Sequence, residues 1–121
     1  MKFISIPTAA VLILALSHLG LTNALGAHHF WSAKVAWIGA PIGMVIALIL
    51  TRLPATFGIL LSLAGAIIAG ATAHYGKLQF AASYAEDRLA GQLWYFGWIA
   101  TAATATALIA LVLYQILASR V

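Results

Sequence analysis

Histidine is the main residue type in this sequence with the capacity for chemistry. Two carboxylates accompany the histidines, Glu86 and Asp87, and there is no cysteine. Without a thiol the sequence offers no thiolate nucleophile and no cysteine metal site. Neutral imidazoles and carboxylates can still ligate zinc or copper, and an imidazole can donate a hydrogen bond to a bound organic group. The four histidines are His18, His28, His29 and His74.

Three kinds of site are compatible with these residue types. A haem held by two histidines would need His18 and His74 at similar depth on facing helices. A quinone or similar head group needs one hydrogen-bond donor and an aromatic wall, which His18, Trp37, His74 and Tyr95 can supply. We favour this quinone-type site, with a metal ion or a haem as alternatives. The residues available to a metal, in a spacing that matches no established motif, are His18, His28, His29, His74 and Asp87.

The composition indicates that the elements carrying these residues are surrounded by lipid. Of the 121 residues, 64% are hydrophobic and only 7% are charged, and the mean hydropathy is +1.07. Ordinary soluble domains carry about 25% charged residues, and a short chain cannot bury so much apolar surface within itself. A soluble globular enzyme is therefore excluded. The six lysines and arginines are spread evenly, so the net charge of +4 does not form the basic patch of a nucleic-acid binder.

Four apolar stretches between the charged residues can each cross a membrane, which takes about 20 residues as a helix. The sequence therefore predicts an all-α membrane protein, a single domain of four transmembrane helices in an up-down-up-down bundle. Pro54 suits the first turn of the third helix, so that helices two and three form an antiparallel hairpin. The stretch 76–92 is long enough for a short interfacial helix. The predicted spans lie near 4–25, 30–51, 54–75 and 93–117.

The first stretch carries the only titratable side chain expected well inside a predicted span. His18 is expected about two turns inside the end of that helix. Because no other ionisable residue is embedded, the sequence argues against proton-coupled transport, which needs such a group. Lys2, an apolar run and then Thr22-Asn23-Ala24 also resemble a secretory signal, but we expect this stretch to be a true span.

Alternating helix directions place the candidate residues at one membrane surface. The histidines, both carboxylates and most tryptophans and tyrosines fall on the side of the connections 26–33 and 76–92. Lysine and arginine number three on each side, so the positive-inside rule gives no preference. Only the free amino terminus and the carboxylates of Glu86 and Asp87 tilt the balance of charge, and on that basis we expect a bacterial inner membrane protein with both termini in the cytoplasm.

Small residues at four-residue spacing indicate close packing of three predicted helices. Pro41 in the second helix removes the hydrogen bond to the Trp37 carbonyl and is expected to kink the axis. Threonines of the fourth helix, Thr101, Thr104 and Thr106, are expected to bond back to their own helix. The small-residue rows are Gly39, Gly43 and Ala47; Gly58, Ser62, Ala66, Gly70 and His74; and Gly97, Thr101 and Ala105.

These features favour a small integral membrane subunit that scaffolds a larger assembly of the respiratory or photosynthetic type. It would help to bind a lipid, quinone or pigment at the face rich in histidine and aromatic residues. Its expected partners are the lipid bilayer and other membrane subunits, or further copies of itself, and not nucleic acid. One alternative is a homo-oligomeric channel or facilitator lined by the Pro41 kink and the threonines of the fourth helix. The other is a compact metal-dependent membrane enzyme, although we expect no catalysis.

Overall fold

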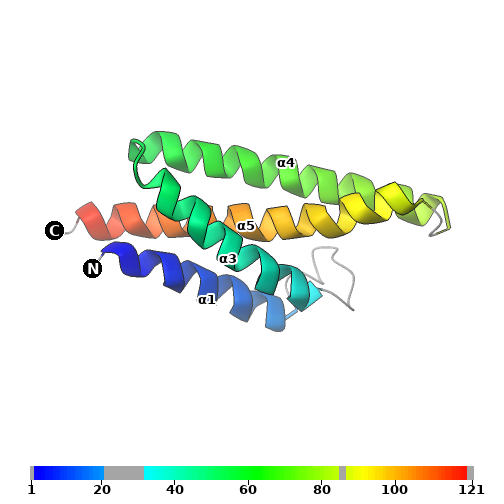
Figure 1. Ribbon diagram of the computed structural model, residues 1–121, viewed down its shortest axis with the longest axis horizontal. Helices are drawn as coiled ribbons and strands as arrows, with labels where there is room; N and C mark the ends of the chain where they lie inside the picture. Colours follow the sequence, from blue (N-terminus) through cyan, green and yellow to red (C-terminus); the bar gives the residue numbers. More distant parts are fainter. Residues whose placement is uncertain (1, 21–31, 85–86, 120–121) are drawn as a thin grey trace.

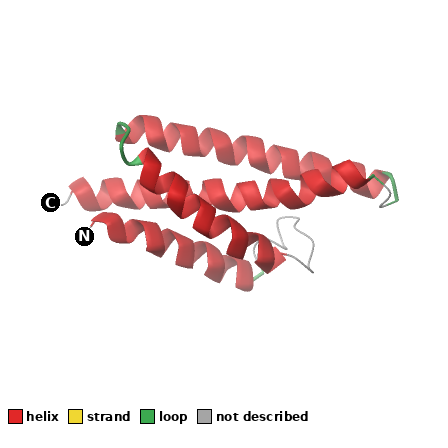
Figure 2. Cartoon of the chain, viewed as in Figure 1, coloured by secondary structure: helices red, strands yellow, loops and turns green. Residues whose placement is uncertain are grey.

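The computed structural model describes residues 2–20, 32–84 and 87–119, which are almost entirely helical (Figure 1). Successive helices run in opposite directions, and no strand occurs in the described ranges (Figure 2). The expected all-helical fold with four main helices is confirmed. The elements are the 3-10 turn η1 (Lys2–Ile4), α1 (Ser5–His18), α3 (Ser32–Leu50), α4 (Ala55–Ala82) and α5 (Arg88–Ser119).

Helix α5 is the central element of this bundle. It packs against α1, α3 and α4, and α1 also packs against α3. In a square bundle the consecutive helices α3 and α4 would pack along each other. Here they approach at the connecting turn, where the Leu50 carbonyl oxygen is 3.4 Å from the position that a Cβ on Gly58 would take. Beyond the turn they diverge (Figure 1), so the expected hairpin is antiparallel in direction but not closely packed along its length.

Helix α1 ends at His18, well before the predicted limit at residue 25. The reason is Gly20, whose φ of +96° is a left-handed conformation that closes a helix C-terminus. The N–H groups of Leu19 and Gly20 donate to the carbonyls of Ala15 and Ser17, each at 3.0 Å. His18 therefore lies at the last position of α1, and the expectation that it lies two turns inside the helix is wrong.

Most of the stretch 76–92, expected to connect two helices, belongs to the helices themselves. Helix α4 continues to Ala82 and α5 begins at Arg88. A Cβ on Gly76 would lie 2.7 Å from the Ala90 carbonyl oxygen, and one on Gly91 would lie 3.0 Å from the Phe80 ring. Because these positions lack side chains, the two helices stay in close contact up to the connecting turn. The described residues of this stretch thus belong to α4, to α5 or to the turn between them, and they form no separate interfacial helix.

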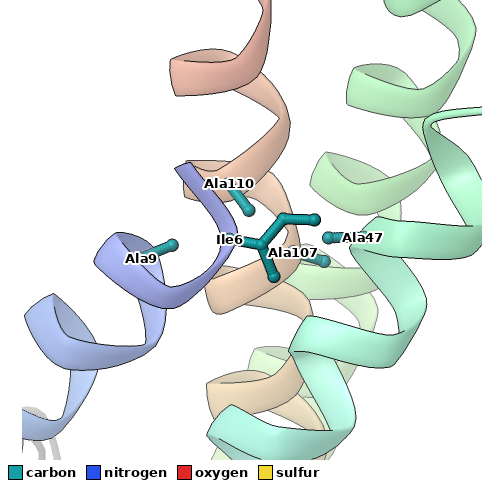
Figure 3. Close-up of a cluster of buried hydrophobic side chains, with 5 residues drawn as sticks. All are labelled: Ile6, Ala9, Ala47, Ala107 and Ala110. Atoms are coloured by element: carbon teal, nitrogen blue, oxygen red, sulfur yellow. The ribbon is translucent and has the colours of Figure 1, made fainter. Parts of the chain in front are cut away.

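Small side chains form the interior, and large aliphatic side chains cover the outside. The largest fully buried side chains are only Val35, Thr106 and Ser5. On α4, by contrast, Ile67 and Ile68 are 63% and 66% exposed. Water-soluble domains show the opposite distribution, because large aliphatic residues are among those most often buried. The core cluster in Figure 3 joins α1, α3 and α5 through Ile6, Ala9, Ala47, Ala107 and Ala110.

Two glycines of α3 allow the closest approach to α5. A Cβ on Gly39 would lie 2.7 Å from the Ala102 Cβ, and one on Gly43 would lie 2.6 Å from the Thr106 Cβ. No larger residue fits at either position without moving the helices apart. The expected small-residue packing of this helix is confirmed.

The small-residue row expected on α4 does not stay on one face. Gly58 and Ser62 are buried, but nothing lies within 4 Å of a Cβ on Gly70, and His74 is exposed. Four residues make slightly more than one turn, so each step rotates such a row by about 40°. The row therefore leaves the α5 side, and the buried face continues instead through Ala69, Ala73 and Gly76.

Helices α4 and α5 are each long and apolar enough to cross a membrane, whereas α1 and α3 contribute shorter apolar segments. At 1.5 Å per residue, α5 is about 48 Å long, which exceeds the hydrocarbon core of a bilayer at about 30 Å. The end of α4 and the start of α5 accordingly project past α1 and α3 (Figure 1).

Candidate functional site

The residues favoured for a quinone-type site include one pair that the fold brings into direct contact, His18 and Trp37. The Trp37 indole Nε1–H donates a hydrogen bond of 2.8 Å to Nε2 of His18. The two rings meet edge to face, with centroids 6.0 Å apart and an interplanar angle of 74°. His18 ends α1 and Trp37 lies near the start of α3, so this bond joins the ends of two adjacent helices.

The backbone around Trp37 is held firmly while its side chain faces outward. The preceding residues Val35 and Ala36 are completely buried, whereas Trp37 is 56% exposed. Pro41 lies four residues further along α3 and has no N–H to donate to the Trp37 carbonyl. Trp37 thus presents an accessible aromatic ring, and its carbonyl lacks the usual helical donor.

The hydrogen bond from Trp37 determines the chemistry that His18 can perform. Since Nε2 accepts the indole N–H, a neutral imidazole at this position carries its proton on Nδ1. The Nδ1–H group can donate to a carbonyl or phosphate oxygen of a bound molecule. Coordination of a metal through Nε2 would require the bond to Trp37 to break, so the pair suits an organic head group better than a metal ion.

His74 and Tyr95, the other two residues of the expected quinone-type site, lie on α4 and α5. His74 is exposed on α4, which packs mainly on α5 and not on α1. Tyr95 is partly buried, and its ring contacts Phe96 at a centroid distance of 5.2 Å. The structure therefore groups His18 with Trp37 and places His74 on a different flank of the bundle. The two histidines expected for a haem lie on α1 and α4, which flank the central helix on different sides (Figure 1).

The residues expected to ligate a metal do not converge in the described part of the chain. No group of three or more histidine, aspartate or glutamate side chains occurs among residues 2–20, 32–84 and 87–119. His28 and His29 lie outside the described residues, as does Glu86. Of the expected ligands, His18 bonds to Trp37 and His74 faces outward.

Asp87 has a structural role at the start of α5. Its Oδ1 accepts a hydrogen bond of 3.0 Å from the Ala90 N–H, the arrangement of a helix N-cap. Its own N–H donates to the Ser83 hydroxyl at 2.9 Å, and that hydroxyl donates to the Phe80 carbonyl at 2.9 Å. These bonds link the end of α4 to the start of α5 and give Asp87 a structural role as a helix cap.

The threonines of α5 form hydrogen bonds within their own helix. Thr101 donates to the Gly97 carbonyl at 2.7 Å, and Thr106 donates to the Ala102 carbonyl at 2.7 Å. Thr104 donates to the Ala100 carbonyl at 2.8 Å. The expectation that these hydroxyls bond back to the helix is confirmed, and their protons are not directed to a solute path.

One cluster at the opposite end of the bundle was not anticipated. Residues of η1, of the end of α3 with the turn that follows it, and of the end of α5 line an open pocket of about 580 Å³, which includes Phe3, Arg52 and Tyr114. Its sequence signal was limited to Phe3 beside Lys2 and to the position of Lys2 and Arg52 at the ends of apolar stretches. A contact between residues so far apart in the chain could not be read from the sequence alone.

Comparison with protein families, with curated proteins and with solved structures found no match for this chain. Its function is therefore inferred from the residues and contacts described above.

Proposed function

We propose that this chain is a small integral membrane subunit that scaffolds a larger membrane assembly of the respiratory or photosynthetic type. The proposal places it in a bacterial inner membrane with both termini on the cytoplasmic side. The observation that carries the proposal is the outer face of α4, where Leu60, Ile67 and Ile68 are 56%, 63% and 66% exposed. A continuous apolar surface of this kind is covered by lipid or by a protein partner.

A groove between α4 and α5 supports association with a partner helix. The groove has a volume of about 400 Å³ and includes Gly65, Ala69, Gly97 and Ala100. Small residues allow another backbone to approach closely in lipid, where van der Waals contact drives helix association. The groove also contains Thr72, whose hydroxyl already donates to the Ile68 carbonyl at 2.8 Å. An apolar transmembrane helix therefore meets no unsatisfied donor there.

The pair formed by His18 and Trp37 is the proposed position of a bound lipid or quinone head group. The exposed indole of Trp37 provides a flat apolar surface. The Nδ1–H of His18 provides one donor beside it, because Nε2 is occupied by the bond to Trp37. One donor next to an aromatic surface is the minimum that orients a head group carrying a carbonyl oxygen.

Site-specific photocrosslinking in the native membrane tests the proposed association. A benzoyl-phenylalanine replacing Phe96, which is 58% exposed and lines the groove, is expected to form a covalent product with a different polypeptide. The matched control is the same group replacing Val11, which is 62% exposed on the outer side of α1. Mass spectrometry of the products identifies the partner.

The possible products separate the proposal from its alternatives. A product with another polypeptide from Phe96, absent from Val11, supports a subunit of a larger assembly. A product between two copies of this chain favours a homo-oligomer, as the channel alternative requires. Lipid adducts alone at both positions would contradict the subunit proposal.

A further inference from the structure

The pocket at the end of the bundle that holds the N-terminal turn has an apolar side and a cationic side. Leu48, Ile49 and Phe3 supply the apolar walls, and Arg52 and Thr51 lie at the α3 turn. Its volume of about 580 Å³ is within the range of ligand-binding pockets, about 300–1,000 Å³.

Tyr114 of α5 joins the two sides of this pocket. The Lys2 ammonium lies 5.3 Å from the centroid of the Tyr114 ring, within the distance of a cation–π contact. Phe3 meets the same ring edge to face, with centroids 5.2 Å apart. These contacts hold the Lys2 charge beside the pocket, at the same end of the bundle as Arg52.

Among the described residues, no side-chain carboxylate lies near either cation. The sequence contains two such residues, Glu86 and Asp87, and the described one, Asp87, caps the opposite end of α5. At 1.5 Å per residue, the start of α5 is about 40 Å from Tyr114 along the helix. Physiological salt screens charges beyond about 8 Å, so Asp87 does not neutralise Lys2 and Arg52.

We propose that this pocket binds the phosphate-bearing headgroup of an anionic phospholipid. Lys2 and Arg52 contact the phosphate, and Leu48 and Ile49 line the path of the acyl chains toward the membrane interior. This site is separate from the pair formed by His18 and Trp37, and it rests on the proposed function in requiring that the chain lies in a membrane with this end of the bundle at the cytoplasmic surface. Both cations belong to the side assigned to the cytoplasm, the leaflet that carries anionic lipid.

Native mass spectrometry of the full chain, delipidated in mild detergent, tests this site. Phosphatidylglycerol and phosphatidylcholine with matched acyl chains are added in parallel, and inorganic phosphate is added in a third sample. Phosphatidylglycerol is expected to bind more tightly than phosphatidylcholine, and inorganic phosphate is expected not to compete. Each cation near a headgroup contributes about fivefold to affinity, so the double variant K2Q/R52Q should bind phosphatidylglycerol about 30-fold more weakly.

A matched variant at the opposite end controls for total charge. K77Q/R88Q removes two cations as well and is expected to bind phosphatidylglycerol as the unaltered chain does. Circular dichroism of both double variants checks that they retain the helical fold, and the comparison of the two lipids on the unaltered chain needs no variant.

Equal binding of both lipids, or equal loss of phosphatidylglycerol binding in both double variants, would overturn the proposal. Equally tight binding of inorganic phosphate would assign the pocket to a free anion. Crosslinking at Phe96 does not depend on any of these results, so the two proposals can fail separately.

Discussion

At the scale of single residues, the bond from Trp37 to His18 depends on one acceptor nitrogen of the imidazole. The Trp37 indole N–H donates to Nε2 of His18 at 2.8 Å. A side chain at position 18 without an acceptor atom cannot receive this bond. The contact between the end of α1 and the start of α3 is then lost, and the indole N–H is left without this acceptor.

Tryptophan fluorescence follows this bond. The emission of Trp37 is obtained as the difference between the unaltered chain and a Trp37→Phe variant. We expect His18→Leu to shift this emission, because leucine offers the indole N–H no acceptor. His18→Gln should leave the emission closer to that of the unaltered chain, because its side-chain amide oxygen is an acceptor. Equal shifts in the two variants would show that the hydrogen bond does not determine the emission.

At the scale of the elements, glycines determine how closely the helices pack around α5. Gly43 and Gly70 lie at the middle of two different helices but have opposite surroundings. A Cβ on Gly43 would overlap the Ala103 carbonyl oxygen and lie 2.6 Å from the Thr106 Cβ, whereas nothing lies within 4 Å of a Cβ on Gly70. Substitutions at the two positions therefore separate the effect of contact between helices from the effect of glycine's flexibility on the unfolded chain.

Alanine substitution at these two glycines should have opposite effects on stability. Gly43→Ala is expected to lower the free energy of unfolding by about 1–3 kcal/mol, because the added methyl group forces α3 away from α5. Gly70→Ala is expected to raise it by about 0.4–1 kcal/mol, because alanine restricts the unfolded chain. Thermal unfolding in mild detergent, followed by circular dichroism, measures both. Equal effects of the two substitutions would mean that α3 and α5 do not meet at Gly43.

At the scale of the whole molecule, the bundle is open and its outer surface is apolar. Helix α4 contacts its neighbours mainly along one face directed at α5. Its remaining faces carry large aliphatic side chains, and the interior is built from alanine and glycine. This arrangement has little hydrophobic driving force in water, because the side chains that gain most from burial stay outside. The proposed membrane environment removes that difficulty.

A lysine on the outer face of α4 distinguishes the membrane from water. Ile67→Lys places a charge near the middle of α4, where Ile67 is 63% exposed. Insertion into a bilayer should become less favourable by about 2.5–3.5 kcal/mol, and the fraction of protein recovered in membranes should fall. Gln79→Lys, near the end of the same helix, is the control and should insert normally. Unchanged insertion of Ile67→Lys would contradict the proposed span, since a water-exposed lysine is well tolerated.

Much of the helical architecture follows from local patterns in the sequence. Long apolar stretches separated by charges predict four helices, and short connections such as residues 51–54 predict their alternating directions. Small residues such as Gly39 and Gly43 predict close packing on the second helix. Each of these features depends on residues close to one another along the chain, so the sequence alone is sufficient.

Which helices and side chains contact each other depends instead on the tertiary structure. A fixed four-residue step predicted one face for Gly58 through His74, but helical rotation carries Gly70 and His74 off it. Only the packed bundle showed that α5 is central, that Trp37 meets His18 and that Lys2 lies over Tyr114. These residues are far apart in sequence, and composition does not specify which faces of similar apolar helices meet. Close contact between backbones at a few glycines and alanines makes that choice, because van der Waals packing is sensitive to a single methyl group.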